Sequence, residues 1–170
     1  MSGQQRRLGR GMILVAALGA LGLLTLLFDQ LIAGQRNPNQ RPLSSTGDGY
    51  AEVTLQANRQ DSYVAAALIN GSEAEVLVDT GATQVAVSDS LARRLGLPRG
   101  ASFTVSTANG SATAYQTQIT SIRLGPIELR DVSAAVVPNM RSPDVLLGMN
   151  FLRELELVQS RGQLVLRQYQ

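Results

Sequence analysis

The 170-residue sequence contains no cysteine, no histidine and no lysine. Without cysteine the chain has no disulfide, no thiolate nucleophile and no cysteine-ligated zinc or iron–sulfur site. Without histidine it has no Ser-His-Asp or Cys-His catalysis and no histidine-ligated metal. The side chains that remain for hydrolytic chemistry are mainly Asp, Glu, Tyr, Ser and Thr. The acidic residues therefore carry the greatest weight in the search for a catalytic site.

The excess of positive over negative charge is small, and aromatic residues are few. The formal net charge is +2, and aromatic residues make up 4% of the chain. Every basic residue is an arginine: Arg6, Arg7 and Arg10 lie together near the N-terminus, and the others are scattered. No basic stripe is interleaved with aromatic side chains on which bases would stack, so we expect no nucleic-acid partner. The length and the 44% of hydrophobic residues suit one domain with appendages.

Long apolar runs are absent except for one near the N-terminus. Residues 12–28 (MILVAALGALGLLTLLF) carry no charge, and Leu31 and Ile32 lengthen the run. At about 1.5 Å per residue, this length suits a hydrocarbon core of roughly 30 Å. The arginines before the run favour an N-terminus that stays in the cytoplasm. We therefore predict a cytoplasmic segment over residues 1–11 and a transmembrane signal anchor over residues 12–32.

Two other interpretations of this run stay open. A cleaved signal peptide has a similar basic start and apolar middle, although Leu31 stands at the −3 position of the small pair Ala33-Gly34. A buried helix of the domain fits less well, because the run is apolar on every side. The residues that follow are polar and rich in Gly, Pro, Asn and Ser, so we predict a flexible linker over residues 33–49. Such a linker lets two anchored domains meet in the membrane plane.

From residue 50 onward, short apolar runs alternate with turn residues, which predicts a mainly β domain over residues 50–170. Asn70-Gly71 predicts a hairpin between two of these strands. A short helix is expected over residues 88–96, with Ser88 as its N-cap and Gly96 at its end. A second helical turn is expected after a strand within residues 146–157. The other expected strands outside the hairpin cover residues 51–56, 103–106, 112–119, 121–124, 127–129, 132–137 and 163–167.

One carboxylate stands at the end of an apolar run. The strand 76–78 (VLV) leads directly into Asp79, Thr80 and Gly81. An acid at this place is costly unless it is paired or used, and the hydroxyl and the glycine supply a local donor and a sharp turn. An aspartic peptidase needs this arrangement, but the triplet occurs once and acid–base work by carboxylates needs two. The residues indicate either half of an active site that a second copy completes or an ordinary turn.

Two further motifs follow in the sequence. Residues 107–110 read TANG, and residues 146–148 read LLG and continue into Met149-Asn150-Phe151-Leu152. With the loop 78–83 (VDTGAT) before them and Leu95-Gly96-Leu97 between, they make the chain resemble the retropepsin-like aspartic peptidases. The resemblance covers residues 50–170 and is strongest with the small membrane-anchored bacterial branch of that group.

The resemblance implies a single-lobed acid-protease barrel that forms a homodimer, with the active site on the two-fold axis. Asp79 of each copy would form the catalytic pair, which shares one proton because two carboxylates about 3 Å apart do not both ionise easily. The active-site loop would comprise Thr80, Gly81, Ala82 and Thr83. The flap over the bound peptide would comprise Thr107, Ala108, Asn109 and Gly110. The segment that supports the loop would comprise Leu146, Leu147 and Gly148.

The same resemblance implies a function. The chain would be a membrane-tethered aspartic endopeptidase of a bacterial inner membrane, with its catalytic domain in the periplasm, a polypeptide substrate and no metal or organic cofactor. A catalytically silent dimeric module that grips extended peptides is the alternative, and hydrolysis of cell-wall peptides also stays open. For residues 107–110, a plain hairpin turn is the alternative to a flap.

Two positions depart from the family pattern. Bacterial members often carry Gly-His-Tyr where this chain has Asp61-Ser62-Tyr63. Viral members usually carry an Asp where this chain has Thr83. An ion pair between subunits is therefore not expected at Thr83.

Overall fold

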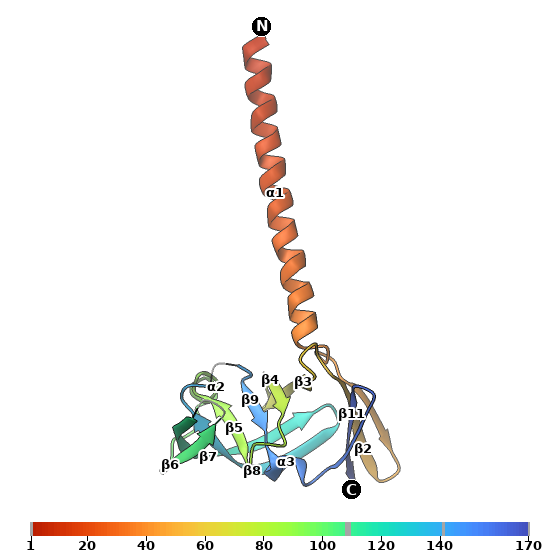
Figure 1. The fold of residues 1–170 in the computed structure, drawn as a ribbon, viewed down its shortest axis with the longest axis vertical. Helices are drawn as coiled ribbons and strands as arrows, with labels where there is room; N and C mark the ends of the chain where they lie inside the picture. The colour runs from red at the N-terminus through yellow and green to blue at the C-terminus, as the bar shows by residue number, and fades with distance from the viewer. Residues whose placement is uncertain (1, 108–109, 141, 170) are drawn as a thin grey trace. The chain divides into compact units, whose positions relative to one another are not determined.

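The computed structural model describes residues 2–107, 110–140 and 142–169. It divides the chain into two units, Met1–Arg36 and Asn37–Gln170. The first unit is one helix, α1 (Ser2–Arg36), drawn in red to orange in Figure 1. Its part Ala16–Arg36 is long and apolar enough to cross a membrane, a test that signal sequences also pass. The side chains described in that part are exposed, as a helix with no partner within its unit requires.

The second unit is mainly β, as predicted, with two short helices, α2 (Asp89–Arg94) and α3 (Met149–Leu152). Its smaller sheet is antiparallel and has the strand order β1-β2-β11-β10. The strands of this sheet are β1 (Leu43–Gly47), β2 (Tyr50–Gln56), β10 (Glu156–Ser160) and β11 (Gln163–Tyr169). Buried and half-buried side chains alternate along β2, so one face of this sheet packs on the core.

The larger sheet has the strand order β3-β4-β9-β5-β8-β7-β6. Its strands are β3 (Val64–Ile69), β4 (Ser72–Val78), β5 (Val85–Ser88), β6 (Ser102–Thr107), β7 (Gly110–Leu124), β8 (Ile127–Val137) and β9 (Val145–Leu147). The sheet closes on itself because β3 also pairs with the far end of β7. Closure removes the free edges of β3 and β7 there and produces the barrel that the resemblance implies.

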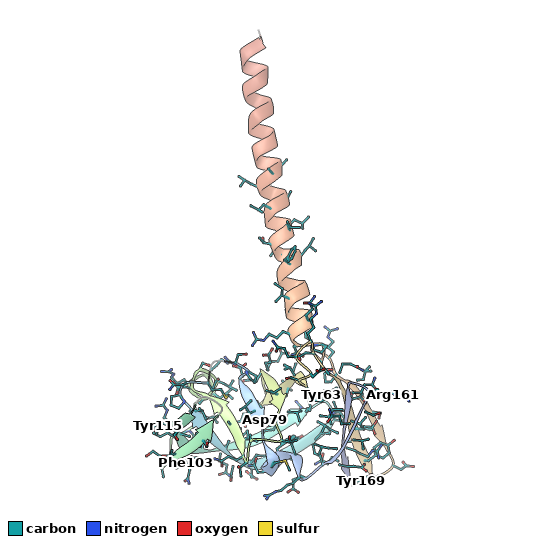
Figure 2. The ribbon with its side chains drawn as sticks, viewed as in Figure 1. Tyr63, Asp79, Phe103, Tyr115, Arg161 and Tyr169 are labelled. Carbon is teal, nitrogen blue, oxygen red and sulfur yellow. The ribbon has the colours of Figure 1, made fainter. Side chains whose placement is uncertain are left out.

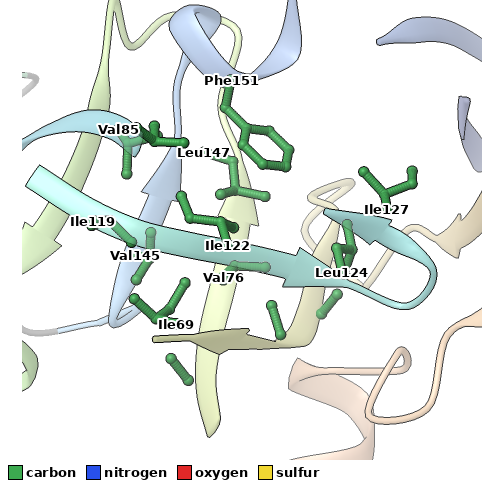
Figure 3. Close-up of a cluster of buried hydrophobic side chains, with 14 of the residues drawn as sticks. Ile69, Val76, Val85, Ile119, Ile122, Leu124, Ile127, Val145, Leu147 and Phe151 are labelled. Carbon is green, nitrogen blue, oxygen red and sulfur yellow. The ribbon is translucent and has the colours of Figure 1, made fainter. Parts of the chain in front are cut away.

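A shared apolar core lies inside this closed sheet. Val76 of β4, Ile122 of β7 and Leu147 of β9 have no exposed surface, and neither does Phe151 of α3 (Figure 3). At about 25 cal/mol for each Å² of apolar surface removed from water, side chains of this size are the main source of stability. The core therefore fixes β4, β9 and α3 against one another, and these elements carry the site described below.

Short-range signals in the sequence match the structure closely. β3 and β4 form the predicted hairpin, and Asn70 and Gly71 have the φ angles of 49° and 80° that its turn requires. Ser88 caps α2 by accepting a hydrogen bond from the Leu91 backbone N–H at 3.2 Å, and Gly96 follows the helix at a φ of 63°. The hairpin and the cap are confirmed.

Two long strands replace several shorter ones that the sequence predicts. β7 and β8 pair antiparallel from Tyr115–Val136 to Leu124–Ile127 around a turn at Gly125. The predicted interruptions lie near Thr120 and Asp131, where the ladder skips one pair but keeps its register. Asp131 has a φ of 52°, so a local kink, rather than a break between strands, accounts for the polar residues there.

The structure also differs from the predicted linker over residues 33–49. α1 continues to Arg36, and β1 pairs with β2 within the predicted linker. Asn39 is 3% exposed, and its amide donates to the carbonyls of Gln56 at 2.9 Å and Val64 at 2.7 Å. Its Oδ1 accepts from the Gln56 backbone N–H at 2.7 Å. A side-chain amide thus pairs with Gln56 as a strand would, which composition alone does not reveal.

Candidate active site

Asp79 follows the last residue of β4 and lies near the middle of the second unit in Figure 2. Its backbone N–H donates to the Leu147 carbonyl at 3.1 Å, and the Val78 N–H before it donates to the Tyr63 carbonyl at 3.0 Å. The carboxylate is half-buried, and its Oδ1 accepts from the Gly81 N–H at 2.9 Å. Neighbouring strands on both sides therefore fix the backbone of Asp79, and no described residue bonds the second oxygen, Oδ2.

A tight turn follows the acid. The Ala82 N–H donates to the Asp79 carbonyl at 3.2 Å, which closes the turn over Thr80 and Gly81. Thr80, Gly81 and Thr83 are exposed, whereas Ala82 is half-buried. Because the Gly81 N–H donates to Oδ1, the turn itself orients the carboxylate. The loop presents a fixed acid and an exposed hydroxyl on the surface of the single chain.

The parallel pairing of β4 with β9 brings the third motif to this loop. Val78 lies opposite Leu147, so the residues after them, Asp79 and Gly148, emerge at the same edge of the sheet. Leu147 is buried and Leu146 is half-buried on β9. The Met149 N–H, one residue beyond Gly148, donates to the Ala82 carbonyl at 2.8 Å. The structure thus brings Leu146, Leu147 and Gly148 against the loop that carries Asp79.

A glycine is required at position 148 because a side chain would not fit there, and not because of its backbone conformation. Its φ of −82° is one that any residue adopts. A Cβ at this position would lie 2.4 Å from the Gln84 carbonyl oxygen and 2.9 Å from the Ala82 carbonyl oxygen. Because both are backbone atoms of the loop, no rotamer change would relieve the overlap. The close approach of α3 to the loop therefore depends on this glycine.

Asn150 also positions the loop, although the motifs in the sequence predict no separate role for it. Its Oδ1 accepts from the Val85 N–H at 2.8 Å, and its Nδ2 donates to the Ser133 carbonyl at 2.7 Å. Its own backbone N–H donates to the Thr83 carbonyl at 3.2 Å. The side chain of Asn150 therefore joins β5 to β8, and its backbone ties the same residue to the end of the loop. The only signal in the sequence is an amide side chain directly after Gly148 and Met149.

The predicted flap lies on a hairpin. β6 and β7 pair from Ser102–Tyr115 to Thr107–Gly110, and Gly110 has a φ of 103°. Ala108 and Asn109 lie outside the described residues, and so does the side chain of Thr107. The structure therefore provides a two-stranded arm, while its role as a cover over substrate stays a prediction.

A single carboxylate is either a base or an acid at a given moment, so acid–base catalysis by carboxylates requires a second one. A single-lobed barrel with an Asp-Thr-Gly turn at the end of β4, backed by a glycine after β9, defines the retropepsin-like class of aspartic proteases. The chain belongs to the family described as gag-polyprotein putative aspartyl protease, which matches residues 65–154, more than half of its length.

Two solved structures and one curated relative are similar to this chain. A retropepsin-like aspartic protease from Rickettsia conorii is 25% identical, with a TM-score of 0.59 over 74% of this chain and 96% of that one. The EIAV protease complexed with the inhibitor HBY-793 is 22% identical over 56% of this chain and 89% of that one, with a TM-score of 0.45. A Sinorhizobium sp. protein described as "Uncharacterized protein in cobV 5'region" is 35% identical over 136 residues, 78% of this chain. The chain spans 58% of that relative's length.

Proposed function

We propose that the protein is a membrane-tethered aspartic endopeptidase whose catalytic pair consists of Asp79 from each copy of a homodimer. The observation that carries this proposal is the state of Asp79: its backbone is fixed, one carboxylate oxygen is oriented by Gly81, and no described residue bonds the other. An acid held in this way, with its loop exposed, is prepared for a partner. The family and the Rickettsia fold support a protease.

In the proposed reaction, the two Asp79 carboxylates share one proton. The ionised carboxylate takes a proton from water as the water oxygen attacks the peptide carbonyl carbon, and the protonated one gives its proton to the carbonyl oxygen. In the collapse of the tetrahedral intermediate, the protonated carboxylate gives its proton to the amide nitrogen and the C–N bond breaks. The ionised carboxylate takes the proton of one hydroxyl of the intermediate, so the amine and the carboxyl product leave and the pair again holds one proton. The pair titrates as a unit, so its acid and base roles belong to neither copy until an asymmetric peptide binds.

The remaining loop and hairpin residues have supporting roles in this proposal. The exposed Thr80 hydroxyls brace the two loops against each other, and the turn at Gly81 leaves room for the substrate backbone. The arm of β6 and β7 covers an extended polypeptide substrate, with the turn at residues 107–110 as its tip. Extended peptides suit this arm because strand edges bind them through main-chain hydrogen bonds.

Membrane tethering is the second part of the proposal. The apolar stretch Ala16–Arg36 of α1 and the arginines near the N-terminus favour a single-pass anchor in a bacterial inner membrane with the protease unit in the periplasm. The full chain should then stay in the membrane pellet after alkaline carbonate washing and keep its N-terminal peptide in mass spectra. Release into the supernatant, with the N-terminal peptide missing, would instead identify a cleaved signal sequence.

The decisive experiment is Asp79→Asn in the full chain, assayed on denatured proteins with and without a statine-type inhibitor. Asn keeps the acceptor for the Gly81 N–H, so the fold and the dimer should persist while cleavage falls at least roughly 100-fold. Asp48→Asn, in an exposed turn, is the matched control and should leave cleavage unchanged. Cleavage retained by Asp79→Asn would refute the proposal, and peptide binding without cleavage by the natural chain would identify the silent module.

A further inference from the structure

Four large apolar side chains are exposed on the described part of the second unit. Three of them, Leu43, Val158 and Tyr169, lie on strands of the smaller sheet. The fourth, Met149, is 40% exposed and is the first residue of α3. Met149 is thus the one member of this group that lies beside the Asp79 loop.

Backbone hydrogen bonds hold Met149 at that place. Its N–H donates to the Ala82 carbonyl at 2.8 Å, and its carbonyl accepts from the Arg153 N–H at 3.0 Å. The residue before it, Gly148, contacts the same loop so closely that a side chain would not fit. The backbone of Met149 is therefore tied directly to the loop, and its uncharged side chain is exposed although methionine is as easily accommodated in an apolar core.

The proposed pair of Asp79 carboxylates determines which molecule contacts the surface around the Asp79 loop. Two carboxylates share a proton when they lie about 3 Å apart, and the sequence supplies one Asp-Thr-Gly loop per chain. The second Asp79 therefore brings the surface around its own loop into contact with this one. Thr80 and Thr83 are exposed in this loop, and the exposed Met149 is bonded to it through its backbone; none of the three carries a charge, so these side chains do not repel an identical copy.

We propose that Met149 of each copy is buried by the other copy when the active dimer forms, as the apolar contact that holds the two Asp79 loops together. This inference rests on the proposed function, because it takes the occupant of the surface to be a second copy of the chain. A flexible thioether suits the position, since methionine adapts to irregular gaps and is enriched at protein interfaces.

The test compares dimer dissociation constants of full-length chains in detergent, measured by dilution of fluorescently labelled protein. Met149→Glu places two charges in the proposed contact and should raise the dissociation constant roughly ten-fold or more, with a matching loss of cleavage at low concentration. Met149→Leu should stay within about two-fold of the natural chain, because it keeps the apolar volume. Val158→Glu is the matched control, since Val158 is 48% exposed on the smaller sheet, and it should also leave the constant unchanged.

A second measurement reports the contact directly. The chain has no cysteine, so Met149→Cys and Val158→Cys each introduce a single thiol. Dimer formation in the presence of a statine-type inhibitor should slow maleimide labelling at position 149 and leave labelling at position 158 unchanged. Near-ultraviolet circular dichroism checks that each variant is folded, and Met149→Gln replaces Met149→Glu where the charged variant unfolds.

The outcomes separate this inference from the proposed function. Equal dimerisation of Met149→Glu and the natural chain, or equal labelling at position 149 with and without inhibitor, would overturn the Met149 contact alone if Asp79→Asn is inactive. A natural chain that cleaves peptides as a monomer, or an active Asp79→Asn variant, would overturn the proposed function itself. Weakened dimerisation by Met149→Glu, with Val158→Glu unaffected, supports both.

Discussion

A single glycine, Gly148, determines how closely α3 packs against the loop that carries Asp79. Gly148 has an ordinary φ, so its requirement comes from the Gln84 and Ala82 carbonyls that a Cβ would strike. Those carbonyls belong to the loop that orients the carboxylate, and the Ala82 carbonyl also accepts the Met149 N–H. A side chain at position 148 would therefore disturb both the packing of α3 and the position of the loop that carries Asp79.

Gly148→Ala should destabilise the second unit by roughly 1–3 kcal/mol, the usual cost of forcing a methyl group into filled space. Cleavage should fall further than the loss of folded protein explains, because the loop must shift away from α3. Urea unfolding followed by near-ultraviolet circular dichroism measures the first effect, and kcat/KM measured well below the transition measures the second.

The control for this glycine is Gly34→Ala. Gly34 lies in α1 with nothing within 4 Å of the position of a Cβ, so an added methyl group has no atom to strike. Its unfolding curve and kcat/KM should match those of the natural chain. A Gly148→Ala variant that matched the natural chain as well would show that the loop yields to α3 without cost.

The segment that follows α1 holds two strands in place through Asn39, a role that its composition does not predict. Asn39 bonds the end of β2 through Gln56 and the start of β3 through Val64. β3 in turn pairs with β4, whose Leu77 lies opposite Val64 two residues before Asp79. The segment after α1 is thus built into the unit that carries the acid.

Asn39→Ala should lower the free energy of unfolding of the second unit by about 2–4 kcal/mol. The reason is that the substitution leaves the Gln56 N–H, the Gln56 carbonyl and the Val64 carbonyl without their partner in a buried place. Gln40→Ala, at the exposed neighbouring position, should change it little. The tyrosine signal in near-ultraviolet circular dichroism isolates this unit, because all four tyrosines lie in it. Equal unfolding curves for the two variants would contradict the role of Asn39.

The sequence predicts those elements whose signals are local. Asn70-Gly71 and the Ser88 cap act within four residues, and both are found where they are predicted. Asn39 and Asn150 act across 17 to 65 residues, so their bonds follow from the finished fold and not from any spacing in the chain. For the same reason Asp79 and the segment 146–148 are readable from their motifs, whereas the bonds that Asn150 makes to β5 and β8 are not.

At the scale of the whole molecule, the proposed site belongs to two chains at once. A mixed dimer of one natural chain and one chain with the Asp79→Asn substitution has a single carboxylate at the site and lacks the shared proton. When equal amounts of the two chains assemble at random, half of the dimers are mixed and one quarter are wholly natural, as expected for a symmetric homodimer. Cleavage should therefore fall to about one quarter of the value for the same total amount of natural chain.

This mixing experiment distinguishes a shared site from two independent ones. Independent sites would keep about half of the activity in the mixture, because each natural copy would work whatever its partner. Asp48→Asn mixed in the same ratio controls for dilution and handling and should leave full activity. Mixing must take place before assembly, by co-expression of the two chains with different tags, since a dimer tight enough to resist exchange would hide the effect. A value near one quarter would establish that both carboxylates act on one peptide bond, and a value near one half would show that each Asp79 works alone.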